Sequence, residues 1–446
     1  MLDNQIRISN GRAKDVMFSI VVAIIMIFTF ALPQAVFADS SENSDDDDST
    51  NIVYPERMKN RQTWEWFLSA PGLLVNLPFT ITLKITEKIV STVYQPQMVG
   101  WMYDITTSDD STRAIRPAYG TRSGLGFKIY QKKLVNDESN IELSAKMGLN
   151  NRQKYQLKFE DFKIIEKRLY TDFTIGYRLL HDQEFYGYGP DTEIEDETVH
   201  AFERGWLEWN LHFSIMHDLK ASTALTYDHN NVLRCWGDPE EQATLDVYDH
   251  STLAGLEKEV RILGVLGRLQ YDSRNSIGGP KRGQIINLSA GIYNQLEDDN
   301  YKFWKASFDF RQYIHLFAGR VFQLKFAGEM SEPLDDKRIP FYYLGELSWT
   351  DNIRGFENGR FHDYDMVMGS IEYRYPIWTK LPNTVDAFWF LDVGQVANDI
   401  FKDIDTDKFK YGYGGGFRVW NDFSESLNLV FAASKEEFRV YLEVNN

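Results

Sequence analysis

Residues 304–311 read WKASFDFR, and this stretch decides the fold class. Every even position is apolar, from Trp304 through Phe308 to Phe310, and every odd position is polar. A period of two places alternate side chains on opposite faces of a β-sheet. The stretch therefore predicts a strand with one apolar face and one polar face.

The same alternation recurs from about residue 123 to the C-terminus. Residues 169–178 read LYTDFTIGYR, residues 207–215 read LEWNLHFSI and residues 438–444 read FRVYLEV. The apolar rows hold large aromatic side chains over lengths close to the ~9–11 residues that a tilted membrane strand needs. The opposite rows carry formal charges, such as Asp309, in the middle of a segment. We therefore predict an all-β, closed antiparallel outer-membrane β-barrel with a wet interior, whose lipid-facing residues include Trp209, Trp304, Phe308 and Phe310.

Composition agrees with this class and excludes others. The mean hydropathy is −0.40, and only the stretch near residue 16 approaches the ~18 apolar residues of a spanning helix, which excludes a bundle of membrane helices. The net charge of −17 repels phosphate and argues against nucleic acid as a partner. The single cysteine, Cys235, excludes an intramolecular disulfide framework and a Cys-rich metal site. A water-soluble secreted sandwich or solenoid is the alternative fold.

Three segments precede the barrel. Residues 1–38 combine basic residues, an apolar run and a small-residue cleavage pattern ending at Ala38, which predicts a cleaved signal peptide. An uncleaved anchor helix is the alternative. Residues 39–61 begin with an acidic tract and are predicted to be disordered. Residues 62–122 contain paired tryptophans and proline-interrupted helical spacing, which predict a short helical segment at the periplasmic interface.

The barrel itself is predicted to span residues 123–446, in the outer membrane of a Gram-negative-type bacterium. Fifteen strand candidates are found there. Because a closed bacterial barrel needs an even number, we expect sixteen strands, with the missing one within residues 97–122 or 183–204. Short turns alternate with long connections at 229–260 and 331–365, which predicts short turns on the periplasmic side and long loops outside.

Four motifs follow one another along the barrel region. Residues 272–274 read DSR with Pro280 and Gly283 behind them, and residues 353–356 read IRGF. Residues 372–377 then read EYRYPI, and residues 390–394 read FLDVG. In this order they resemble the barrel of the bacterial surface antigen superfamily, which includes the BamA and TamA assembly factors and two-partner secretion transporters. The resemblance covers roughly residues 123–446.

The motif residues suggest a lock between a loop and the barrel wall. Arg354 stands in a long loop beside Gly355, which permits a tight backbone turn. Inside the lumen its guanidinium would need carboxylate partners, and Glu372 and Asp392 lie on inward rows. The resemblance implies that Arg354 packs against Phe390 and Asp392 with Glu372 close by. Gly355 and Phe356 complete the candidate lock. An exposed arginine without a partner is the alternative.

The resemblance also implies a function. Family members insert, assemble or translocate proteins or lipid at the outer membrane, and a weak seam between first and last strands opens laterally. Expected partners are outer-membrane lipid and, as candidates, outer-membrane protein clients or an accessory periplasmic subunit. The family's periplasmic POTRA modules do not fit residues 39–122, however. A passive water-filled pore or a structural outer-membrane protein without client activity is therefore the alternative.

Enzymatic chemistry is not expected. The sequence has no HExxH, GxSxG or P-loop lysine motif, and its eight histidines show no metal-ligand spacing. We therefore predict no catalytic residue, no cofactor and no metal. The glycine-rich residues 412–416 lead into a strand rather than a helix, so they are expected to permit barrel curvature or close approach of another backbone instead of binding phosphate.

Overall fold

The computed structural model describes residues 106–120, 122–165, 168–235, 242–256, 259–348, 352–378, 384–420 and 425–444. The predicted signal peptide (1–38), the acidic segment (39–61) and residues 62–105 of the predicted helical segment lie outside these ranges. None of the helices within them combines the length and apolar character needed to cross a membrane.

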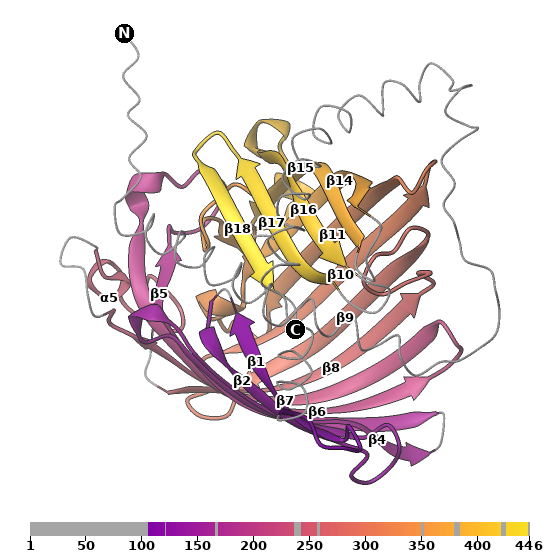
Figure 1. Cartoon of the computed structure of the whole chain (residues 1–446). Coiled ribbons are helices and arrows are strands. Elements are labelled where there is room, and N and C mark those ends of the chain that lie inside the picture. The colour runs from indigo at the N-terminus through magenta and orange to yellow at the C-terminus, as the bar shows by residue number, and fades with distance from the viewer. Residues whose placement is uncertain are drawn as a thin grey trace, which may run out of the picture.

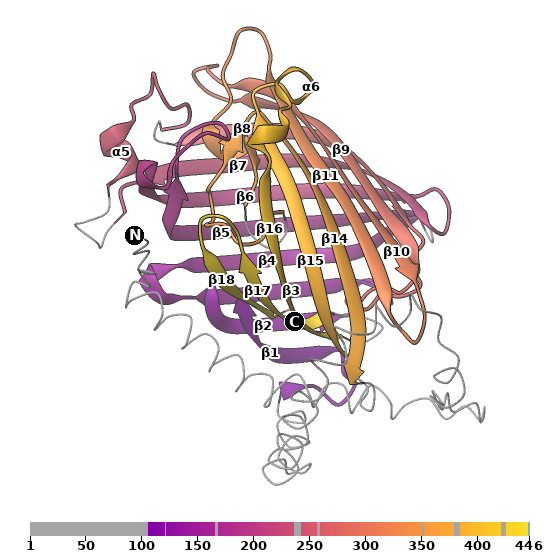
Figure 2. The ribbon, with the colours of Figure 1, turned by 90° about the horizontal axis from the view of Figure 1, so that it is seen from above.

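Sixteen strands form one antiparallel sheet in which each strand pairs with its neighbours along the chain. They are β1 (Arg113–Gly120), β2 (Gly124–Lys132), β3 (Asn140–Met147), β4 (Gln153–Ile165), β5 (Leu169–Phe185), β6 (Thr198–Ser214), β7 (Leu219–Leu233), β8 (Val260–Asp272), β9 (Gly283–Gln295), β10 (Lys302–His315), β11 (Val321–Pro333), β14 (Asp365–Trp378), β15 (Thr384–Ala397), β16 (Lys410–Trp420), β17 (Glu425–Ala433) and β18 (Phe438–Val444). The sheet curves into a nearly closed barrel (Figures 1 and 2).

The remaining elements are short and lie in the connections. A second, two-stranded sheet pairs β12 (Gly345–Glu346) with β13 (His362–Asp363) inside the connection from β11 to β14. The helices are α5 (Thr244–Val247) and α6 (Ile400–Asp403), together with single 3-10 turns at Leu149–Asn151, Ile194–Asp196, Phe341–Tyr343 and Thr406–Lys408.

The expected count of sixteen strands is confirmed, and β1 is the strand that the fifteen candidates lacked. It lies in the range 97–122, so the sheet begins at Arg113 and not at residue 123. Its sequence, RAIRPAYG, does not alternate between apolar and polar residues and contains a proline, which explains why the period did not reveal it. The other candidate range, 183–204, holds the ends of β5 and β6.

The first and last strands form a seam, which we define as the junction between β1 and β18. Both strands lie on the same side of the molecule in Figures 1 and 2, and their Cα atoms approach within 8 Å. Within the described residues no ladder pairs them, whereas every other strand of the wall has ladders on both sides. The barrel is therefore nearly closed, and the complete closure that the sequence predicts is not confirmed within the described residues.

Connection lengths distinguish the two ends of the barrel. At one end, which we call the long-loop end, lie the connections 186–197, 234–259, 334–364 and 398–409. At the other, the short-turn end, lie turns such as 166–168, 215–218 and 316–320. The long-loop end also carries the tight turn 434–437 between β17 and β18.

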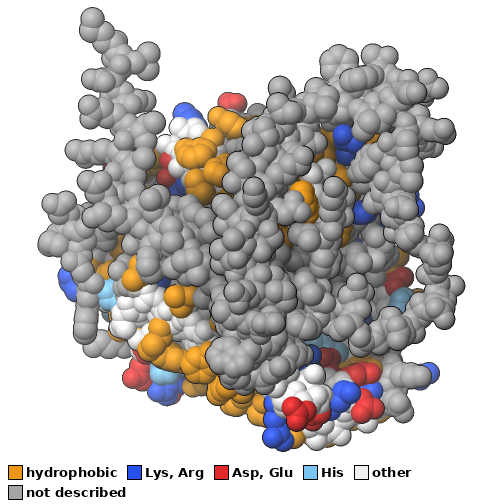
Figure 3. Space-filling view, in the orientation of Figure 1, with side chains coloured by type: hydrophobic (Ala, Val, Ile, Leu, Met, Phe, Trp, Pro, Cys, Tyr) orange, Lys and Arg blue, Asp and Glu red, His pale blue; other side chains and the backbone are white. Residues whose placement is uncertain are grey.

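The wall has an apolar outer face and a polar inner face. On β10, Lys305 reaches inward and its Nζ donates to the Tyr343 carbonyl of a long loop at 3.0 Å. Trp304, Phe308 and Phe310 occupy the alternate, outward row, and Phe308 is 39% exposed. Trp209 on β6 is 44% exposed, also on the outer face. Figure 3 shows hydrophobic side chains gathered along the lower part of the molecule and charged ones at its lower right.

Candidate functional site

The connection from β11 to β14 folds into the barrel because its apolar side chains need cover. Leu347, Ile353, Phe356 and Phe361 are all at most 2% exposed and pack against inward residues of β11, β14 and β15. Full burial of such a side chain contributes roughly 1.5–3 kcal/mol. These contacts carry the polar residues between them, including Arg354, into the lumen.

Arg354 forms a two-pronged ion pair with the wall. Its Nε and Nη2 donate to the two oxygens of Asp392, each at 2.7 Å, and its backbone N–H donates to Asp392 Oδ2 at 3.1 Å. Its Nη1 donates to Glu372 Oε2 at 3.3 Å. The guanidinium also stacks on Phe390, with 3.4 Å from Cζ to the ring centroid. The structure thus brings together Arg354, Asp392, Glu372 and Phe390.

The register of β14 and β15 sets this geometry. Ser370 is opposite Asp392, and Glu372 is opposite Phe390, so all four side chains gather at one place on the inner wall. Ser370 Oγ donates to Asp392 Oδ1 at 2.6 Å and accepts from Arg354 Nη2 at 3.3 Å. Asp392 is 0% exposed. A carboxylate buried this deeply is stabilised by a paired cation together with hydrogen bonds.

Glycines let the loop backbone lie against the wall. Gly355 has φ +95°, a conformation that side chains rarely adopt. A Cβ on Gly412 of β16 would stand 1.9 Å from the Arg354 carbonyl oxygen. For the glycine-rich stretch the sequence predicts barrel curvature or close approach of another backbone, and at Gly412 the Arg354 segment makes that close approach.

A cavity of about 390 Å³ lies next to Arg354 inside the barrel. The 273–282 turn reaches it from the short-turn end, where Arg374 Nη2 donates to the Pro280 carbonyl. Residues of the first three sequence motifs line this cavity, and Asp392 of the fourth binds Arg354 at its edge. Five cationic side chains besides Arg354 take part in the lining: Arg274, Arg311, Lys325, Arg374 and Arg418.

Sequence reasoning missed two members of the site. Arg418 on β16 donates to Glu372 Oε1 at 3.0 Å, so Glu372 bridges two arginines. Tyr441 on β18 accepts the Gly355 N–H at 3.0 Å and donates to the Phe356 carbonyl at 3.2 Å. Both residues lie on strands with alternating apolar and polar side chains. The alternation predicts which face of the sheet a side chain is on, but it does not predict which residue the side chain contacts. The four outward aromatics, Trp209, Trp304, Phe308 and Phe310, lie on the opposite face of the wall.

The arrangement joins a loop to a wall by charge and packing. Arg354 is hydrogen bonded to Asp392, Glu372 and Ser370, and these bonds fix the position of the loop in the lumen. Within the part of the chain that the structure describes, no group of three or more His, Cys, Asp or Glu side chains could hold a metal ion.

Comparisons with known proteins agree with the barrel fold. The family model for the Omp85 superfamily domain matches residues 137–425. No curated protein matches the sequence. Among solved structures, BamA from Haemophilus ducreyi lacking POTRA domains 1–3 is 16% identical, with a TM-score of 0.54 over 75% of this chain and 70% of that chain.

Two further solved structures are less similar. CdiB from Acinetobacter baumannii is 11% identical, with a TM-score of 0.45 over 74% of this chain and 58% of its own. CdiB from Escherichia coli is also 11% identical, with a TM-score of 0.46 over 75% and 65%. The family match confirms the resemblance to BamA- and TamA-like barrels. The matched region spans more than half of the residues of this chain. The chain therefore belongs to the Omp85 superfamily and forms an outer-membrane barrel.

Proposed function

We propose that this barrel inserts, assembles or translocates proteins at the outer membrane by opening at the seam. The observation that carries the proposal is the ladder pattern of the wall. Every other strand is held by ladders on both sides, but β1 and β18 are each held on one side only within the described residues. Opening the barrel at the seam therefore breaks fewer backbone hydrogen bonds than opening it anywhere else.

The sequence of β1 supports this role. Pro117 stands in the middle of the strand, opposite Phe127 of β2. Proline has no N–H to donate, and within sheets it is typical of edge strands. A strand edge of this kind can add the extended segment of a client by backbone pairing. Clients would therefore be proteins with strand-forming segments, and an accessory periplasmic subunit could deliver them.

The Arg354 site would serve this function without covalent chemistry. It anchors the long loop to β14 and β15, and the same loop contacts β18 through Tyr441. The anchored loop therefore supports β18, the strand that would move when the seam opens. We propose that Arg354, Gly355 and Phe356 position the loop. Glu372, Phe390 and Asp392 are the residues of the wall to which the loop is anchored.

A passive pore is the second candidate, and the cavity of about 390 Å³ in the lumen favours it. A disulfide across the seam separates the two candidates. After Cys235→Ser, one cysteine is placed in β1 and one at a facing position of β18, and client assembly is measured in vesicles before and after oxidation. Lateral opening predicts loss of activity on oxidation and recovery on reduction.

The matched control crosslinks a junction that need not open. Ser289 and Ser307 face each other on β9 and β10, with their hydroxyls 2.7 Å apart, so a cysteine pair there bridges an intact ladder. This second disulfide should leave client assembly unchanged. Full activity of the protein crosslinked at the seam would refute the proposal and leave the pore or structural role.

A further inference from the structure

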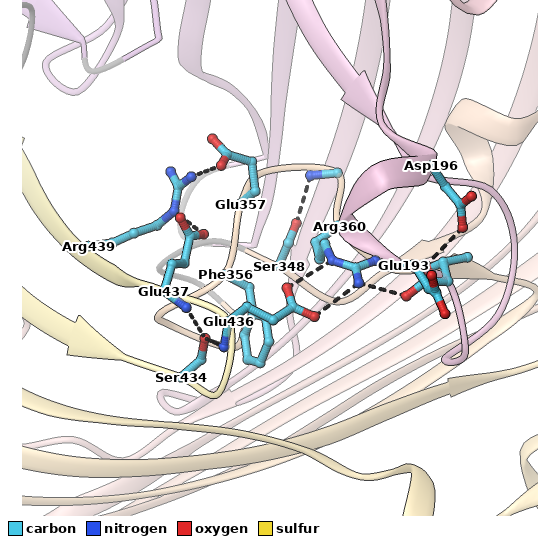
Figure 4. Close-up of polar contacts among 12 residues, drawn as sticks. Glu193, Asp196, Ser348, Phe356, Glu357, Arg360, Ser434, Glu436, Glu437 and Arg439 are labelled. Atoms are coloured by element: carbon cyan, nitrogen blue, oxygen red, sulfur yellow. Dashed lines mark hydrogen bonds and ion pairs between the residues drawn. The ribbon is translucent and has the colours of Figure 1, made fainter. Parts of the chain in front are cut away.

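Arg360 belongs to the same loop as Arg354 but binds different parts of the molecule (Figure 4). It is 2% exposed. Its Nε and Nη2 donate to the two carboxylate oxygens of Glu436, each at 2.9 Å. Its Nη1 and Nη2 donate to the hydroxyl and the carbonyl of Thr192 at 2.7 and 2.6 Å. All three nitrogens of the guanidinium therefore have partners, and the rings of Tyr186 and Phe361 flank it.

These partners come from two segments far apart in the sequence. Thr192 lies in the connection from β5 to β6, and Glu436 lies in the turn from β17 to β18. Ser434 Oγ accepts the N–H groups of Glu436 and Glu437 at 3.1 and 3.3 Å, which fixes the shape of that turn. Through Arg360, the last hairpin is tied to a loop on another part of the barrel rim.

The loop holds the hairpin at further points along β18. Glu357 forms an ion pair with Arg439, which also pairs with Glu437 (Figure 4). Farther along, Tyr441 is hydrogen bonded to the backbone of Gly355 and Phe356. Residues 355–360 thus contact the turn, the start and the middle of β18. We call these residues with Thr192 and Glu436 the hairpin clamp.

The hairpin clamp bears on the seam because of the ladder pattern. The hairpin of β17 and β18 is held to the wall by the ladder from β17 to β16. If β18 moves away from β1 together with its turn, Glu436 must leave Arg360. That separation would leave a buried guanidinium without its carboxylate partner, which is strongly unfavourable.

From this geometry we infer that Arg360 is a positioning residue that holds β18 at the seam, and that release of Glu436 is a step in opening. The inference rests on the proposed function, since it assigns the regulation of the same seam. It differs from the Arg354 anchor, whose partners lie on β14 and β15, away from the strand that moves.

The test measures amide hydrogen exchange of residues 427–444 in the full-length protein in vesicles. Arg360→Ala and Glu436→Gln should speed exchange of the hairpin about tenfold or more, because each leaves the other partner unpaired. Exchange in β8–β11 should not change. Arg360→Lys keeps the charge but not the planar fork, so it should give a smaller acceleration. A general loss of stability would instead move all strands together.

Arg152→Ala is the matched control. Arg152 pairs with both oxygens of Asp182 at the same end of the barrel, and this pair joins the connection from β3 to β4 to strand β5 and not to the hairpin. It should leave exchange of residues 427–444 unchanged. If Arg360→Ala does not fold, Glu436→Gln and Thr192→Val decide, since each removes only part of the contact set. Unchanged hairpin exchange in the folded variants would overturn the inference.

The same variants separate this inference from the proposed function. With the clamp released, the disulfide between β1 and β18 should form more slowly, and client assembly should change with it. Faster hairpin exchange together with activity that survives crosslinking of the seam would keep the clamp and refute lateral opening. Unchanged exchange together with activity that is lost on crosslinking would keep lateral opening and refute the clamp.

Discussion

Arg354 and Arg360 are two buried arginines of one loop, and each grips a carboxylate with the same two-pronged geometry. Their partners differ in how firmly the barrel holds them in place. Asp392 belongs to β15, which has ladders on both sides, whereas Glu436 belongs to the turn of the last hairpin. The comparison teaches that similar ion pairs can have different roles. One fixes the loop to the rigid wall, and the other fixes a movable element to the loop.

This contrast predicts that the wall partner matters most for stability. Asp392→Ala leaves Arg354 buried with Glu372 as its remaining carboxylate, and it should lower the unfolding free energy by about 3–5 kcal/mol. Arg354→Ala should likewise free the loop, lower heat-modifiability on gels and change conductance. Denaturant unfolding in vesicles or detergent measures the first effect.

The control for this prediction is Asp182→Ala. Asp182 pairs with Arg152 at a position where both side chains are a quarter to a third exposed, so its loss should cost only about 0–1 kcal/mol. Equal effects of Asp182→Ala and Asp392→Ala would contradict a special role for burial at the wall.

A second prediction tests the close contact between the backbone of Arg354 and Gly412 of β16. Gly412→Ala places a Cβ where the Arg354 carbonyl lies, so the loop or β16 must shift, at a cost of about 1–3 kcal/mol. Gly267→Ala on β8 is the control, because no atom lies within 4 Å of the Cβ position there. Thermal unfolding compares the two. A loss in Gly412→Ala no greater than in Gly267→Ala would show that the loop is not pressed against β16.

The same substitution sharpens the comparison between the two arginines. A shift confined to the Arg354 segment should leave hydrogen exchange of the 434–437 turn close to its original rate, since Arg360 has its own partners. Acceleration of both regions together would indicate that anchor and clamp form one cooperative unit.

Much of the fold and part of the site could be predicted from sequence, for a physical reason. The wall strands repeat with period two because lipid and lumen face opposite sides, so residues such as Phe308 and Lys305 signal their environments locally. The Arg354 motif was recognisable because its partners follow in fixed order on the next strands. β1 escaped detection because an edge strand with Pro117 need not alternate strictly.

The hairpin clamp was beyond the reach of the sequence. Thr192 and Glu436 stand in connections, where side chains follow no period and pairing depends on how distant loops meet in space. Residues 359–361 read GRF, close behind the IRGF motif, and this repeated pairing of arginine with glycine and phenylalanine is the local signal that the sequence offers. Nothing in it identifies a partner 168 residues away.

The smallest predicted effect concerns a carboxylate of the loop that lies among other carboxylates. Asp363 is 7% exposed, and burial raises its pKa to about 6, with Asp365 and Asp403 adding to the rise and the Tyr364 N–H opposing it. The folded protein therefore holds this proton more tightly than the unfolded chain, whose carboxyl has the ordinary value of 3.8. Its contribution to stability is present below about pH 4 and is lost as the pH rises through 6.

Asp363→Asn should consequently stabilise the protein at pH 7.5 by about 1–2 kcal/mol and give no gain at pH 4. Unfolding curves at pH 4, 6 and 7.5 measure this trend, with Asp298→Asn on an exposed turn as the control. A gain that is independent of pH would mean that the amide helps by hydrogen bonding and not by removing charge. The expected trend would show that Asp392 and Glu436 are stabilised because each pairs with an arginine of this loop, while the charge on Asp363 destabilises the loop because its charged neighbours are Asp365 and Asp403.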